Sequence, residues 1–229
     1  MGYGPAQDLN LDLSRPMTTF TGQDLSCFRG QRLVFTGLSF ALQAGDALIL
    51  RGANGSGKST LLRIMAGLLT PLDGDVRWSD GDATIAADPD THQGRIHYVG
   101  HADAIKPVLS VAENIGFWAG LRTPTPDVAG AMKTLGIAAL ADIPGRFLSA
   151  GQRRRVNLAR ILAAPADLWL LDEPTTALDA SAVVAVRDAV ARHRAGGGMV
   201  VASTHQDLGL DNAAELNLDA YAAEDPVFV

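Results

Sequence analysis

The chain has 229 residues, of which 47% are hydrophobic, and its formal net charge is −6. This length and apolar content allow one buried core, with or without an inserted sub-domain. An acidic chain is poorly suited to broad nucleic-acid binding, which needs a basic surface, so no nucleic-acid partner is expected. Cys27 is the single cysteine of the sequence, which excludes a disulfide framework and a cysteine metal cluster and favours a reducing cytoplasm.

No apolar run in the sequence approaches the roughly 20 residues that span a bilayer. The first residues also lack the apolar centre of a signal peptide. We therefore expect any membrane role to come through another chain. Residues 1–19 are polar and are expected to form a flexible tail, followed by a folded domain at 20–229.

Alternating polar and apolar residues mark the first part of the domain as β-structure. The segment from Phe20 to Asp46 and the segment 74–86, which is bounded by Gly-Asp turns, indicate antiparallel strands. Beyond them, strand-like runs such as DALILRG and LWLLDE alternate with helical patterns, for example at 149–163 and 180–195. This alternation predicts an α/β fold with a mostly parallel sheet.

The segment between His101 and Phe147 is rich in alanine and has helical spacing. It contains SVAE, a capping box in which Ser110 and Glu113 satisfy the first free amides of a helix. We expect a helical sub-domain at about 102–148, inserted into the α/β core.

GANGSGKS, at 52–59, fits the G-x-x-x-x-G-K-[ST] phosphate-loop pattern and follows a predicted strand. Its glycines let backbone N–H groups turn toward phosphate oxygens, at a helix start that adds partial positive charge. Lys58 is expected on the β- and γ-phosphates, and the Ser59 hydroxyl is placed to ligate Mg²⁺. The alternative is a glycine-rich turn with a solvated lysine. The predicted nucleotide-binding residues are Gly52, Asn54, Gly55, Gly57, Lys58, Ser59 and Thr60.

LWLLDEPTTALD, at 168–179, is an apolar strand that ends in two carboxylates. Successive strand residues point to opposite faces, so Asp172 and Glu173 are expected to act differently. We assign Asp172 to the Mg²⁺ shell and Glu173 to the general base that orients the attacking water. The alternative is a polar strand end that leads into a turn at Pro174.

MVVASTHQ, at 199–206, ends a further strand at His205. A lone histidine is more often structural than catalytic. Gly52, Asp172 and His205 all follow predicted strands, however, and parallel sheets bind their ligands at the carboxyl ends of strands. An imidazole there can stabilise charge at the γ-phosphate and report whether that phosphate is present, so His205 is a predicted catalytic residue.

LSAGQRRRVNLARILAAP, at 148–165, places a helix start before three arginines. Ser149 and Gln152 fit a second capping box. Gly151 in the first turn costs about 0.5–1 kcal/mol relative to alanine, and the close approach of an anion is one reason to keep it. Because the chain already has a phosphate loop, this second anion site is predicted to serve another molecule. The alternative is a cap alone, with the arginines 153–155 as solvated surface.

GANGSGKST, LSAGQ, LLDEP, TALD and THQ, in this order, resemble the ATPase cassette of ABC transporters, and the resemblance covers about 20–210. It implies an ATPase whose two copies sandwich two ATP molecules head to tail, with Mg²⁺. Asp179 would lie in the loop that crosses between subunits, and it is also a candidate N-cap for the helix 180–195. The residues that would close the partner's site are Ser149, Gly151 and Gln152.

The resemblance also suggests residues that contact the adenine ring and the metal ion. Phe28 matches an aromatic ring that the family places against adenine, and a buried strand aromatic is the alternative. His101 stands where the family usually has a glutamine that touches the metal and water. A neutral imidazole can also ligate a metal or accept a hydrogen bond, so His101 is kept as a candidate ligand. A transition-metal pair of His97 and His101 is disfavoured, because no other ligands lie nearby in the sequence.

GQRRRVNLAR, STHQ and YVGHADAIKPVLSVAENIGFW most closely resemble the ATPase subunit of the haem-exporter complex of cytochrome c biogenesis. The likeness implies integral membrane permease subunits as partners and a peripheral position at the cytoplasmic face of the bacterial inner membrane. No direct contact with haem is expected. Two rival functions stay open: a soluble, non-transport ABC ATPase that acts in cofactor assembly, and a transporter ATPase for another cargo such as lipid or peptide.

Overall fold

The computed structural model describes residues 18–80, 83–86, 89–204 and 206–222. The first 17 residues of the predicted tail lie outside the described residues, and strand β1 begins at Thr18. The predicted phosphate sensor His205 also lies outside them.

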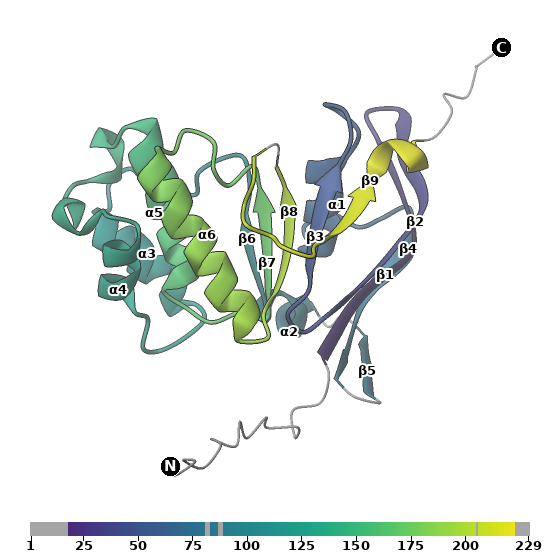
Figure 1. Cartoon of the computed structure of the whole chain (residues 1–229), viewed down its shortest axis with the longest axis horizontal. Helices are drawn as coiled ribbons and strands as arrows, with labels where there is room; N and C mark the ends of the chain where they lie inside the picture. Colours follow the sequence, from purple (N-terminus) through teal and green to yellow (C-terminus); the bar gives the residue numbers. More distant parts are fainter. Residues whose placement is uncertain (1–17, 81–82, 87–88, 205, 223–229) are drawn as a thin grey trace, which may run out of the picture.

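A parallel sheet forms the centre of the molecule (Figure 1). Within the described residues it has five strands in the order β6-β7-β8-β3-β9, and each neighbouring pair is parallel. The predicted α/β fold is therefore confirmed. The strands are β3 (Ala47–Arg51), β6 (Ile96–Val99), β7 (Leu168–Asp172), β8 (Met199–Ser203) and β9 (Ala214–Asn217).

An antiparallel sheet lies on one side of the parallel one (Figure 1). Its strands have the order β2-β1-β4-β5. The predicted segment 74–86 is two paired strands rather than one. The bounds are β1 (Thr18–Arg29), β2 (Arg32–Gln43), β4 (Asp73–Asp80) and β5 (Ala83–Ala86).

Helices α3 to α6 cover the opposite side of the parallel sheet (Figure 1). The capping box predicted at Ser110 and Glu113 is present at the start of α3. Most of the short elements between His101 and Phe147 are helical, as predicted. The helices are α1 (Lys58–Met65), α2 (Pro89–Gly94), α3 (Val111–Gly120), α4 (Val128–Thr134), α5 (Ala150–Leu162) and α6 (Ala180–Ala195), with 3-10 turns η1 (Ala138–Leu140), η2 (Gly145–Phe147) and η3 (Leu218–Tyr221).

The central strands are apolar on both faces because each face packs against a different hydrophobic cluster. In β7, Leu168 and Leu170 join the cluster that contains α1 and the antiparallel sheet, while Trp169 and Leu171 join the cluster on the side of α3 to α6. Every residue of β7 is buried. A parallel strand covered on both sides reads as a continuous apolar run, which is the pattern seen in the sequence.

Strand β9 was not predicted from the sequence. It pairs with β3 at the edge of the sheet, and Leu216 is its one buried residue. A short edge strand with a single buried side chain has no clear alternation. An ion pair across the sheet edge, between Arg51 and Glu215 at 2.8 Å, accompanies the pairing.

Burial keeps two histidines neutral, and their hydrogen bonds indicate which ring nitrogen carries the proton. The Trp78 Nε1–H donates to Nδ1 of His92 at 2.9 Å, and Nε2 of His92 donates to the Met65 carbonyl. His97 Nε2 lies 3.0 Å from the Ala164 carbonyl, which can only accept, so this nitrogen carries the proton. Burial lowers the pKa of His92, and it lowers the pKa of His97 to about 4.

These histidines should make the stability of the protein sensitive to mild acid. Because the pKa of His97 is lower in the folded chain than in the unfolded chain, its contribution is complete above about pH 6.5 and is lost as the pH falls from 6.5 towards 4. We expect the free energy of unfolding, measured in urea, to fall between pH 7.5 and 5.5. His97→Gln keeps a donor for Ala164 and should flatten this dependence; an unchanged slope would contradict the assignment.

Candidate functional site

A cavity of about 450 Å³ opens at the carboxyl ends of the parallel strands. It brings together the phosphate-loop residues, His101 and the two carboxylates at the end of β7, although these lie far apart in the sequence. The lining residues include Asn54, Gly55, Gly57, Lys58, Ser59, Thr60, Arg63, His101, Asp172, Glu173 and Ser203. Of the three residues predicted to meet at this edge of the sheet, Gly52 directly follows β3 and Asp172 ends β7, whereas His205 lies outside the described residues.

The phosphate loop connects β3 to α1 and needs its glycines for two reasons. Gly52 and Gly57 have φ angles of 133° and 106°, which are left-handed values that L side chains rarely adopt. A Cβ on Gly57 would also lie 2.7 Å from a methyl of Val34. The Lys58 ammonium donates to the carbonyls of Gly52 and Ala53 at 2.7 and 2.9 Å, so it lies over the loop.

Asp172 fits the metal role predicted for it. Its side chain is buried, and among the described residues Oδ2 has no hydrogen-bond partner. A buried carboxylate oxygen without a partner is costly unless a donor or a cation satisfies it. Ser59 lines the same cavity and offers a hydroxyl. Hard oxygen donors of this kind suit Mg²⁺ when part of its shell comes from phosphates and water.

Glu173 has an unusual backbone. Strand β7 ends at Asp172, and Glu173 has a φ of 48°, which is rare for a residue with a side chain. We expected the alternation of side chains along a strand to separate the roles of the two carboxylates. That reason is wrong, because the strand ends at Asp172 and Glu173 itself has a left-handed backbone. Such a conformation costs of order 1–3 kcal/mol and persists where surrounding contacts fix it. The N–H of Glu173 donates to the Ser203 carbonyl at the end of β8.

The other residues predicted to contact adenine or the metal ion lie in different places. His101 is exposed and lines the cavity, whereas His97 lines a separate pocket, so the two do not form a pair. Phe28 is 57% exposed and is not among the described residues that line the cavity. The alternative of a buried strand aromatic is therefore wrong, and the ring is available at the surface.

The predicted capping box at the start of α5 is present. Ser149 accepts from the N–H of Gln152, and the Gln152 side chain accepts from the N–H of Ser149. Asp179 caps α6 by accepting from Ala182, as predicted. Within the described residues, the lining of the nucleotide cavity includes neither this helix start nor Asp179. Each chain therefore keeps these residues apart from its own phosphate loop.

Gly151 has a second reason to be glycine. A Cβ at this position would lie 2.8 Å from the carbonyl oxygen of Ala177. Ala177 has a φ of 64° and belongs to the turn between β7 and α6. The sequence argument attributed Gly151 to the approach of an anion, but the first observed constraint is this contact within the chain.

The three arginines after the capping box are not alike, so the alternative of a solvated surface is wrong for two of them. Arg153 is exposed, whereas Arg154 is buried. Arg155 is largely buried, forms an ion pair with Asp179 and donates to the Leu135 carbonyl. It thereby connects α5, the end of α4 and the cap of α6.

Sequence reasoning missed two contacts that fix the phosphate loop from outside. The Asp219 carboxylate in η3 accepts from the N–H of Ala53, and Arg32 donates to the Gly55 carbonyl. Neither residue belongs to a recognisable motif. Asp219 follows the unpredicted strand β9, so its position could not be inferred without that strand.

Comparisons with known proteins agree with this geometry. The family model described as ABC transporter matches residues 35–176, which is more than half of the chain. The chain belongs to the ABC transporter family. Its phosphate loop is accordingly an ATP-binding loop, and the chain is an ATPase of the ABC type.

Curated relatives of this ABC ATPase include two proteins named cytochrome c biogenesis ATP-binding export protein CcmA. The protein from Paramagnetospirillum magneticum is 57% identical, over 90% of this chain and 96% of its own length. The protein from Rhodospirillum rubrum is 58% identical, over 90% of this chain and 88% of its own length.

Solved structures support the fold of this ABC ATPase. An ATP-binding cassette, titled as the dimeric structure of a post-hydrolysis state bound to ADP and Pi, is 21% identical with a TM-score of 0.75, and the match covers 90% of this chain and 97% of that chain. A structure titled ATP binding subunit of ABC transporter is 20% identical with a TM-score of 0.72, over 81% and 79% of the two chains.

In the part of the ABC ATPase that the structure describes, no helix combines the length and the apolar character needed to cross a membrane.

The contact at Gly151 predicts the effect of adding one methyl group. We expect Gly151→Ala to lower the free energy of unfolding by about 1 kcal/mol or more, because overpacking against a backbone oxygen costs about 1–3 kcal/mol and exceeds the gain in helix propensity. Urea denaturation measures this change. Gly120→Ala is the control, because a Cβ at Gly120 in α3 meets nothing within 4 Å. Equal behaviour of the two variants would contradict the contact.

Proposed function

We propose that two copies of this ABC ATPase bind two ATP molecules head to tail and hydrolyse them. The observation that carries the proposal is a division of the site. One cavity contains Lys58, Asp172 and Glu173, while the capped helix start at Ser149 is outside that cavity in the same chain. A second chain can supply the Ser149 turn to the phosphates. A cassette of similar fold, titled as a dimeric structure bound to ADP and Pi, supports the association of two copies.

The geometry of the cavity supports a role for each of its residues. Lys58 and the loop amides bind the β- and γ-phosphates, and Asp172 and Ser59 would hold Mg²⁺, with His101 as a further candidate ligand. When bound, Mg²⁺ neutralises charge on the phosphate oxygens. Glu173, half-buried at the rim of the cavity, takes the proton of the attacking water.

Other assignments within the site rest on the sequence and exposure. His205 senses the γ-phosphate, and this role is inferred from the sequence alone. The exposed ring of Phe28 stacks on adenine. On the partner's nucleotide, the capped turn places Ser149 and Gly151 beside the γ-phosphate, where free N–H groups and the helix dipole favour negative charge. Asp179 lies in the loop that crosses the dimer.

We further propose that the ATPase serves a haem-export complex in cytochrome c maturation. The naming of the two CcmA relatives, which match 90% of this chain, supports this role. The partners would be integral membrane permease subunits, and the ATPase would be peripheral at the cytoplasmic face of the bacterial inner membrane. The domain would run from 20 to 229, with the helical sub-domain at about 102–148 inserted.

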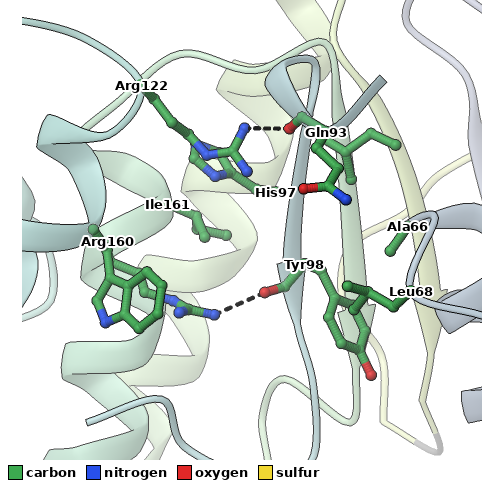
Figure 2. Close-up of a pocket in the computed structure, with 10 residues that line it drawn as sticks. Ala66, Leu68, Gln93, His97, Tyr98, Arg122, Arg160 and Ile161 are labelled. Atoms are coloured by element: carbon green, nitrogen blue, oxygen red, sulfur yellow. Dashed lines mark hydrogen bonds between the residues drawn. The ribbon is translucent and has the colours of Figure 1, made fainter. Parts of the chain in front are cut away.

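One surface pocket offers apolar and basic groups that a permease subunit could contact (Figure 2). It has a volume of about 170 Å³ and is lined by residues of α2, β6, α3 and α5 and of the segment that follows α1. Leu68, which lines the pocket, is 58% exposed, and Leu121, which precedes the lining residue Arg122 in the sequence, is 69% exposed. Arg160 donates to the Tyr98 carbonyl, and burial lowers its pKa to about 10. A partner segment with apolar residues and a carboxylate would complement these groups.

If Glu173 is the general base, removing its carboxylate should trap the protein with ATP bound. Glu173→Gln should bind ATP and Mg²⁺, turn over at least about 100-fold more slowly than the wild type, and accumulate as an ATP-bound dimer. Phosphate release and light scattering measure these quantities. Undiminished turnover by the purified variant would remove Glu173 from the base role.

The Glu173→Gln variant can also be used to test whether two chains share each ATP site. Glu173→Gln combined with Ser149→Arg should still bind ATP but remain monomeric, because the arginine blocks the helix start that covers the partner's nucleotide. The matched control combines Glu173→Gln with Ser110→Arg, which removes the same kind of capping box from α3. Dimerisation of the Ser149 variant would contradict the head-to-tail arrangement.

The haem-export role predicts a cellular phenotype. A strain that lacks this gene should lose covalently bound haem in its c-type cytochromes, and haem staining of membrane fractions measures this loss. The wild-type gene should restore the signal, and Lys58→Ala should not. Normal cytochrome c in the deletion strain would overturn the cargo while leaving the ATPase assignment intact.

Affinity capture from detergent-solubilised membranes of the same strain separates a transporter subunit from a soluble scaffold. The wild type should retain its integral membrane subunits. Leu68→Asp should lose them and still bind ATP, whereas Val184→Asp, a similarly exposed apolar position on α6, should retain them. Capture that yields no membrane chain would favour the non-transport alternative.

A further inference from the structure

Arg154 is a buried charge that the site described above does not use. It lies in the second turn of α5, and its side chain is 6% exposed. It forms an ion pair with Asp103, whose Oδ1 is 3.7 Å from Nη1. Burial lowers the pKa of Arg154, while Asp103 and Asp172 raise it. A charge that leaves water needs compensating partners, and most of those of Arg154 are backbone carbonyls.

The guanidinium donates to four carbonyls at the ends of two neighbouring strands. Nη2 donates to the carbonyls of Asp172 and Glu173 at 2.7 and 2.6 Å. Nε donates to the Pro174 carbonyl at 3.2 Å, and Nη1 donates to the Gly100 carbonyl at 2.8 Å. A planar fork of donors can satisfy this set, whereas an ammonium group or an amide cannot reach all of it.

These bonds act on the residue with the unusual backbone. Glu173 has a φ of 48°, and its N–H is fixed by the Ser203 carbonyl. Arg154 fixes the carbonyls of the same residue and of the residues on either side. A left-handed conformation outside glycine persists where the surroundings over-determine it. The bond to Gly100 also fixes the peptide that leads into His101 at the cavity.

We infer that Arg154 is a positioning residue that holds Glu173 in its left-handed conformation and aligns the carboxylate with the attacking water. The inference rests on the proposed role of Glu173 as the general base. Arg154 lies on α5, the helix whose start is proposed to cover the partner's nucleotide. Its side chain therefore also connects that helix to the general base, Glu173, of its own chain. ATP binding does not require it, because Arg154 is not among the described residues that line the cavity.

The test separates turnover from binding. Arg154→Gln should lower kcat at least 10-fold, while KM for ATP and the Kd for a fluorescent ATP analogue stay within about twofold of the wild type. Arg153→Gln is the matched control, because it removes the same charge from the adjacent, exposed position of α5 and should keep the wild-type kcat. Equal loss of kcat in both variants would overturn the inference, as would a wild-type kcat in Arg154→Gln.

Arg154→Lys keeps the inference testable where Arg154→Gln does not fold. It retains the charge and much of the aliphatic stem but cannot bond four carbonyls. Positioning predicts a lowered kcat with unchanged KM, whereas a purely charge-balancing role predicts the wild-type kcat and would overturn the inference. Failure of the proposed function has a different signature, because in that case Glu173→Gln itself would turn over normally.

Discussion

The parallel arrangement of the central strands is the constraint on which the rest of this structure depends. Because β7 and β8 bury both of their faces, polar groups are tolerated mainly where the strands end. Parallel strands end at one edge, so residues separated by more than a hundred positions meet there. The phosphate loop, His101 and Asp172 form one cavity for this reason.

The elements that carry local patterns could be predicted from the sequence. The phosphate loop, both capping boxes and the apolar strand before Asp172 depend on contiguous residues, and the structure places them as expected. The predictions that were wrong concern residues whose exposure depends on the side of a helix that is covered or on contacts with distant parts of the chain. Arg153 and Arg154 are indistinguishable in the sequence, yet one is exposed and the other buried, because strand ends about 20 and 54 residues away determine which side of α5 is covered.

The backbone of Glu173 shows a second limit of sequence reasoning. The alternation rule applies inside a strand, but β7 ends one residue before Glu173. The left-handed turn that follows is maintained by Ser203 and by a helix from another part of the chain, and a run of strand-forming residues contains no sign of it. Similarly, Phe28 was equally compatible with burial and with exposure, since only the packing of the antiparallel sheet decides between them.

The contact between Lys58 and the carbonyls of its own loop has a thermodynamic consequence for recognition. A free lysine loses up to about 2 kcal/mol of side-chain entropy when it is immobilised. Here the ammonium is already tethered above the loop, so much of that entropy is lost when the chain folds rather than when the triphosphate arrives. Affinity then reflects an exchange of carbonyl oxygens for phosphate oxygens around one preorganised cation.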